Sequence, residues 1–168
     1  MKNEAKSELA KIIGDYDAKL SEVERIAAAN RAADASFPER FLASRSTIIG
    51  PALKEIADML NAAGHDASVR DQEESSSAVG GVKVAAVALR IIPKPFAHKS
   101  TEANPTTIEV MFSANRGERK VVVSSTNTMI SHGGSVGKRG SYELDAVTAD
   151  VVVTHVLQTL NDAFVGRK

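Results

Sequence analysis

The fold of this chain is decided by residues 3–33, which read NEAKSELAKIIGDYDAKLSEVERIAAANRAA. Within this stretch, one set of residues is spaced alternately four and three positions apart. The set is Leu9, Ile13, Tyr16, Leu20, Val23, Ala27 and Asn30. This spacing is a heptad repeat, which places a mainly apolar stripe along one side of a helix, and Ile12 and Ile26 widen the stripe. We therefore predict one long helix over residues 3–33.

The length of this helix has a consequence for association. At 1.5 Å per residue, a helix over residues 3–33 is roughly 45 Å long, which exceeds the width of a domain of this size. The chain itself is therefore too small to cover the whole stripe. A second copy of the chain, or one long neighbouring helix, would cover it. We expect a homo-oligomer, most simply a dimer, that forms through residues 9–30.

The composition is that of a globular protein. The chain has 168 residues, of which 43% are apolar, so it can form one domain or one domain with a helical extension. The 21 basic residues balance the 21 acidic ones, but residues 81–139 contain nine basic and three acidic side chains, a net charge of +6. This asymmetry is compatible with an anionic partner, and equally with a sheet that packs beside its own acidic helices.

The absence of cysteine excludes disulfides, thiol catalysis and thiolate metal sites. The first residues lack the apolar segment of a signal peptide. No apolar run reaches the roughly 18 residues that a membrane-spanning helix needs. We therefore expect a cytoplasmic protein without a membrane segment.

A second helical segment follows the first. Residues 34–36 are predicted to end the long helix, and Pro38 to begin a new one, because proline is tolerated in a first helical turn. Gly50 and Pro51 predict a break or kink, after which Pro51 opens a further helix. Gly64 is expected to end that helix as a left-handed cap. We predict that residues 1–64 fold back as an αα-hairpin, which carries the oligomerisation surface.

The middle of the chain predicts an antiparallel sheet. Residues 66–70 are a candidate short strand, and residues 82–92 are nearly all apolar and end before Pro93. Residues 106–114 and 118–126 alternate between apolar and polar side chains, which predicts a β-hairpin. We expect Arg116 and Gly117 at the centre of a two-residue turn, with positive φ at Gly117 and Phe112 facing Val121. Residues 71–81, 93–105 and 127–142 are interpreted as loops.

The last segment predicts a helix that begins after Thr148 as its cap. Its expected apolar stripe is Val153, Val156, Leu157, Leu160 and Phe164. The predicted class is therefore α+β, with an N-terminal long-helix hairpin, an antiparallel sheet of three to four strands, and a C-terminal helix packed on the sheet. Residues 65–168 hold the sheet and the last helix, and we expect them to form one compact unit with the helices of residues 1–64.

Two motifs suggest chemistry, and neither is complete. The glycine-rich residues 132–140 lack the spacing of a phosphate-binding loop, and no helix follows them directly. Glu118 and Lys120 have the Glu-x-Lys spacing of metal-dependent nucleases, which also requires an upstream acid such as Glu109. We interpret the first motif as a surface loop and the second as the exposed end of the hairpin. We predict no catalytic residue, metal ligand or cofactor.

The candidate binding residues are the cations and histidines of the loops and the hairpin turn: Lys94, His98, Lys99, Arg116, Arg119, His132, Lys138 and Arg139. The loops could bring some of them together, although the simpler interpretation is that all four histidines are unrelated surface residues. The sequence favours a non-enzymatic, self-associating binding or structural protein that dimerises through its first helix. The alternative is a protein that binds an anion or a nucleic acid through the basic sheet edge and the glycine-rich loop. One form of this alternative is a metal-dependent, nuclease-like protein.

Overall fold

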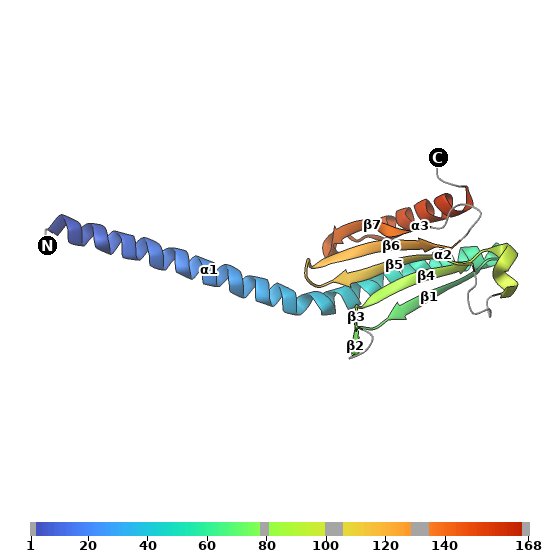
Figure 1. Cartoon of the computed structure of the whole chain (residues 1–168), viewed down its shortest axis with the longest axis horizontal. Coiled ribbons are helices and arrows are strands. Elements are labelled where there is room, and N and C mark those ends of the chain that lie inside the picture. Colours follow the sequence, from blue (N-terminus) through green and yellow to red (C-terminus); the bar gives the residue numbers. More distant parts are fainter. Residues whose placement is uncertain (1–2, 78–80, 100–105, 129–134, 166–168) are drawn as a thin grey trace. The chain divides into compact units, whose positions relative to one another are not determined.

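The computed structural model describes residues 3–77, 81–99, 106–128 and 135–165, and it has an α+β fold (Figure 1). The chain divides into two compact units, residues 1–37 and residues 38–168. The described residues of the first unit, 3–37, are all helical. The second contains the rest of that helix, two further α-helices, short π- and 3₁₀-helical segments, and the described β-strands.

The N-terminal third of the protein is helical from residue 3 to residue 62. Helix α1 (Asn3–Ser44) leads directly into a π-helical turn, η1 (Arg45–Ile49), and then into α2 (Gly50–Ala62). The backbone at Ser44, Ile49 and Gly50 is right-handed helical, so no reversing turn separates the helices. The predicted αα-hairpin is therefore wrong.

The predicted helix end at residues 34–36 is also wrong, because α1 continues through Pro38. Proline inside a helix lacks one N–H donor and crowds the preceding turn. Phe37 and Phe41 lie on either side of Pro38 and are 3% and 0% exposed. Burying two aromatic side chains contributes several kcal/mol, which offsets the loss of one hydrogen bond.

The break or kink predicted at Gly50 and Pro51 is not a break, because the chain stays helical there; the helix instead contains the π turn directly before Gly50. The Gly50 N–H donates to the carbonyl of Arg45, five residues earlier, and Pro51 lies in the first turn of α2. A Cβ atom on residue 50 would lie 2.8 Å from the Arg45 carbonyl oxygen, which is closer than such atoms approach. Any other residue at this position would force the helix backbone to shift, so glycine is favoured here. Gly64 after α2 has φ of +89°, as predicted for a helix cap.

The main sheet has five strands in the order β1-β4-β5-β6-β7, and every neighbouring pair is antiparallel. The strands are β1 (Asp66–Gln72), β4 (Ala86–Ile92), β5 (Ile108–Asn115), β6 (Lys120–Asn127) and β7 (Ser135–Glu143). A separate pair consists of β2 (Ser75–Ser77) and β3 (Gly81–Lys83). The strand count is thus higher than the predicted three to four.

Three predicted segments need correction. The predicted loop over residues 127–142 contains β7, the predicted loop over residues 71–81 contains β2, and the predicted strand over residues 82–92 is divided between β3 and β4. Strand β7 lacks an apolar alternation, but its backbone groups pair with those of β6 along its length. A strand of this kind exists because a neighbour satisfies its N–H and C=O groups, which its own side chains do not reveal.

The β5–β6 hairpin forms with a longer turn than predicted. Phe112 faces Val123 instead of Val121, a slip of two residues that keeps both side chains on the same side of the sheet. The turn spans residues 116–119, and Arg119, not Gly117, has the positive φ, at 55°. The Asn115 side-chain oxygen accepts a hydrogen bond from the Glu118 N–H at 3.2 Å, which stabilises the longer turn.

Helices α2 and α3 (Ala149–Phe164) cover one face of the main sheet (Figure 1). Helix α2 packs on β1 and β4, α3 packs on β5 and β6, and the two helices contact each other. Thr148 caps α3 as predicted, since its hydroxyl accepts a hydrogen bond from the Val151 N–H. The largest fully buried side chains of this core include Phe41, Phe112, Ile49, Leu53, Leu89, Ile91, Ile108 and Val110.

The buried face of α3 differs from the predicted stripe by a one-residue shift. The buried residues are Val152, His155, Val156, Thr159 and Ala163, whereas Leu157, which was predicted to be buried, is 58% exposed. One residue corresponds to a rotation of about 100° around the helix axis. In this orientation the buried side chains of His155 and Thr159 each make one hydrogen bond, while Nδ1 of His155 has no partner among the described residues. His155 bonds to Tyr142, and the Thr159 hydroxyl donates to the His155 carbonyl.

Candidate functional site

The most distinctive surface of the protein is the apolar stripe of α1, which comprises the seven heptad residues from Leu9 to Asn30 together with Ile12 and Ile26; we call it the α1 stripe. Its large apolar side chains, Leu9, Ile12, Ile13, Tyr16, Leu20, Val23 and Ile26, are all 45–64% exposed. Single exposed apolar residues are common on protein surfaces, but a continuous row of this length marks an interaction surface.

The heptad positions of the stripe follow from its spacing. Ile13, Leu20 and Ala27 occupy position a, and Leu9, Tyr16, Val23 and Asn30 occupy position d. The opposite side of the helix carries charged residues that bond to each other. Arg25 donates two hydrogen bonds, of 2.7 and 2.8 Å, to the Glu22 carboxylate. This contact lowers the pKa of Glu22 and raises the pKa of Arg25. Residues 3–37 thus have one side suited to water and one suited to a neighbouring helix.

The predicted binding residues are divided between the two ends of the main sheet. Lys94, His98 and Lys99 lie in the short helix η2 (Lys94–Lys99), which follows the end of β4. Arg116 and Arg119 lie in the turn at the opposite end, because the end of β4 pairs with the start of β5. At roughly 3.3 Å per residue, the length of β5 separates the two groups by about 25 Å. The structure therefore does not bring these five residues together.

The remaining predicted residues are on β7 or outside the described part. His132 lies outside the described residues. Lys138 faces Ser124 of β6, and the next partner of β6 is Gly140, so Arg139 is the extra residue of a β-bulge. A bulge redirects a side chain, and Arg139 points toward α3. There its guanidinium donates to the Asp162 carboxylate and the Ser125 hydroxyl, both at 2.7 Å.

Two of the predicted cations are thus bonded within the chain. Arg139 is bonded to Asp162, with side chains 18% and 24% exposed, and Arg116 forms an ion pair with Glu74 at 2.7 Å. Their part in binding an anion remains a prediction. Lys120 of the Glu-x-Lys motif pairs with Glu143 across β6 and β7 at 3.5 Å. Among the residues that the structure describes, no group of three or more histidine or acidic side chains is placed to hold a metal ion.

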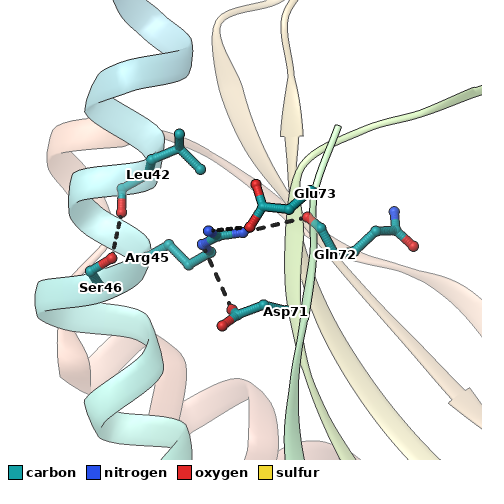
Figure 2. Close-up of polar contacts among 6 residues, drawn as sticks. All are labelled: Leu42, Arg45, Ser46, Asp71, Gln72 and Glu73. Carbon is teal, nitrogen blue, oxygen red and sulfur yellow. Dashed lines mark hydrogen bonds and ion pairs between the residues drawn. The ribbon is translucent and has the colours of Figure 1, made fainter. Parts of the chain in front are cut away.

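The structure shows a polar cluster at the π turn that sequence reasoning missed (Figure 2). Arg45 is only 13% exposed, and its guanidinium donates to Glu73 at 2.7 Å and to the Gln72 carbonyl at 3.4 Å, with Asp71 at 3.7 Å. The cluster ties η1 to the end of β1 and the residues after it. The sequence shows three acidic residues within positions 71–74, but their distance of more than 25 positions from Arg45 hides the pairing.

A second polar cluster lies under α3, where His155 is 5% exposed. The Tyr142 hydroxyl and His155 Nε2 are 2.6 Å apart, and a Cβ on residue 140 would overlap the Tyr142 ring, so Gly140 makes room for it. Burial lowers the pKa of His155 below its ordinary value of 6.5, and the positive charge of Arg139 lowers it further. The interpretation of His155 as a surface residue is therefore wrong. His155 belongs to the core, where the neutral ring is favoured.

Comparison of the chain with protein-family models, with curated proteins and with solved structures finds no match. None of the described helices is both long enough and apolar enough to cross a membrane. The function proposed below therefore depends on the geometry of the chain itself, and above all on the α1 stripe.

Proposed function

We propose that this protein is a self-associating binding or structural protein that dimerises through residues 9–30 and acts by assembly, not by catalysis. The observation that carries the proposal is the exposure of the α1 stripe, from 45% at Leu20 to 64% at Tyr16. Burying such side chains against a second helix removes apolar surface from water, which is the main favourable term in protein association.

The heptad spacing specifies what kind of partner fits. Positions a and d repeat every 3.5 residues on average, and such a seam packs best against another helix with the same repeat. A second copy of the chain always supplies one, at the same concentration and with the same length. The anion-binding alternative is not advanced as a second function, because the described basic residues are divided between the two ends of the sheet and β7, where Arg139 is bonded to Asp162.

The proposal is tested by sedimentation equilibrium of the full chain at micromolar concentrations. We expect dimers for the natural sequence. Leu20→Asp places a carboxylate in the centre of the seam of each copy, and it should weaken dimerisation at least about a hundredfold.

The matched control is Ala18→Asp, which introduces the same side chain on the exposed outer side of the helix. It should leave the dimer intact. A natural sequence that is monomeric at micromolar concentration, or equal effects of the two substitutions, would contradict the proposal.

A further inference from the structure

The charged residues that flank the α1 stripe distinguish a parallel from an antiparallel arrangement of the two α1 helices in the proposed dimer. We infer that the second copy of α1 lies parallel to the first and in register with it. This inference rests on the proposed dimer, and it adds the orientation of the partner. The charges belong to heptad positions e and g, which border the seam on either side.

In a parallel dimer, position g of one helix faces position e of the other helix five residues further on. Lys19 occupies position g and Glu24 occupies position e. Lys19 of each copy therefore faces Glu24 of the other copy, so two attractive pairs form in every dimer. The other g positions are Ile12 and Ile26, which bring no repulsion to this arrangement.

The two flanking charges are available for such pairs. Both side chains are exposed, and neither Lys19 nor Glu24 forms an ion pair with a described residue of its own chain. Glu22 and Arg25, which lie away from the seam, are instead bonded to each other at 2.7 Å. The chain thus satisfies charges on its outer side internally and leaves complementary charges beside the seam.

An antiparallel dimer with overlapping stripes loses this complementarity. In that arrangement position e faces e and position g faces g. With Leu9 opposite Ala27, Asp17 meets Asp17 and Lys19 meets Lys19; with the helices shifted by one heptad, Asp17 meets Glu24. Asn30, the polar residue of the seam, would also lie opposite Ile13 or beyond the stripe. In the parallel register Asn30 meets its own copy, where two amides can hydrogen-bond to each other.

The parallel register has a functional consequence. Residues 38–168 follow the stripe in sequence, so a parallel coiled coil places both copies of this unit after the same end of the coil. A multivalent target could then engage two copies at once, and linkage of this kind raises the effective concentration for the second contact.

Disulfide trapping tests the orientation directly, because the natural sequence has no cysteine. Full-length Leu9→Cys and Ala27→Cys variants are equilibrated in a glutathione redox buffer and analysed without reductant. In the parallel register each variant meets its own cysteine and should form a covalent dimer alone, since a disulfide needs Cα atoms within about 7 Å. Ala18→Cys, on the outer side of the helix, is the matched control and should remain unlinked.

The alternative outcomes separate the two claims. If only a mixture of Leu9→Cys with Ala27→Cys becomes linked, the dimer is antiparallel and the inference fails while the proposed function stands. If no variant becomes linked and the natural sequence sediments as a monomer, the proposed function itself fails.

Charge exchange supplies a second readout that does not depend on cysteine. Lys19→Glu converts both attractive pairs into repulsive ones and should weaken the parallel dimer about threefold to tenfold, as expected for exposed ion pairs counted twice. The double variant Lys19→Glu/Glu24→Lys should restore the natural dissociation constant. A single variant with an unchanged dissociation constant would contradict the parallel arrangement, because in an antiparallel dimer the substitution only replaces a contact between two lysines with a contact between two carboxylates.

Discussion

Two helices of this protein carry apolar stripes, and the stripe of α3 is covered by the sheet whereas the stripe of α1 is exposed. On α3, Val152 and Val156 are 0% exposed, because the sheet covers them. On α1, Val23 is 62% exposed. The periodicity of the two stripes is the same in kind, since both follow the 3.6-residue turn of the helix. An apolar stripe therefore shows that a helix needs a partner. It does not show whether that partner belongs to the same chain.

The polar contacts of the two regions differ in the same way. Arg45 and Arg139, in the unit of residues 38–168, are 13% and 18% exposed and bond to carboxylates far away in sequence. Arg25, on α1, is 71% exposed and bonds to a neighbour three residues away. Shielded ion pairs join elements of the fold, whereas an exposed pair of this kind is screened by water and salt.

The two regions can be followed separately in one molecule. The chain has two tyrosines and no tryptophan. Tyr16 lies on the α1 stripe, and Tyr142 lies in the His155 cluster. A Tyr16→Phe background therefore makes tyrosine fluorescence a reporter of the sheet unit alone, and the predictions below use it.

The largest difference between the regions should appear when an apolar side chain is truncated. Phe112→Ala removes a ring that is 0% exposed, and it should lower the free energy of unfolding by about 3–5 kcal/mol. Val23→Ala on the α1 stripe should change that value by less than about 0.5 kcal/mol, while it weakens dimerisation. Urea unfolding followed by Tyr142 fluorescence measures both, and similar losses in the two variants would remove the distinction.

A smaller difference is expected for the ion pairs. Arg139→Met removes hydrogen bonds to Asp162 and Ser125 and should cost about 1.5–2 kcal/mol, the lower part of the range for charged hydrogen bonds because the pair is partly exposed. Arg25→Met should produce no measurable loss. Urea unfolding at low and high salt provides the comparison. A salt-sensitive loss in Arg25→Met, with none in Arg139→Met, would reverse the assignment of which pair is structural.

Substitution of one glycine in each region compares how the two helical backbones respond to an added Cβ atom. Gly50→Ala forces a Cβ against the Arg45 carbonyl and should destabilise the sheet unit by about 1–2 kcal/mol. Gly14→Ala meets no atom within 4 Å and should increase the helix content of α1, worth up to about 1 kcal/mol. Circular dichroism and urea unfolding of the two variants should therefore change in opposite directions. A Gly50→Ala variant as stable as the natural sequence would show that the helix accommodates a Cβ at this position and would contradict the steric argument.

The smallest effect concerns pH. The pKa of His155 is lowered in the folded state, so below about pH 6.5 the unfolded chain binds more protons than the folded one, and stability decreases as the pH decreases. Above that pH the contribution is complete. His155→Gln should flatten the stability profile between pH 5 and 7, relative to the natural sequence, as measured by urea unfolding. An unchanged profile would show that His155 does not titrate on unfolding.

Local chemistry could be predicted where it depends on neighbouring residues. The caps at Gly64 and Thr148 and the end of β4 before Pro93 are predicted and confirmed, and the position of the π turn coincides with the break or kink predicted at Gly50 and Pro51. Each involves a residue with a restricted or unusual backbone, and its effect extends only over one turn. The shared face of Phe112 and Val123 was predicted for the same reason, because side-chain alternation survives a two-residue slip.

The polar clusters could not be predicted, because their members are far apart in sequence. Arg45 meets Glu73, and Tyr142 meets His155, only after the sheet and helices have packed. These contacts also explain two wrong predictions. The hydrogen bond to Tyr142 allows His155 to be buried, and α3 is therefore rotated relative to its predicted orientation. The bulge that directs Arg139 inward lies in β7, whose residues the sequence pattern assigns to a loop.

The sequence by itself determined that residues 3–33 form a helix with one apolar side, because that property depends only on spacing and on the absence of proline. Only the tertiary structure decided that this helix continues through Pro38 into α2, since the burial of Phe41 offsets a local penalty. Tertiary structure likewise decided that the α3 stripe is covered and the α1 stripe is exposed. Covering a stripe requires surface from another element, and no pattern within a helix encodes where that element comes from.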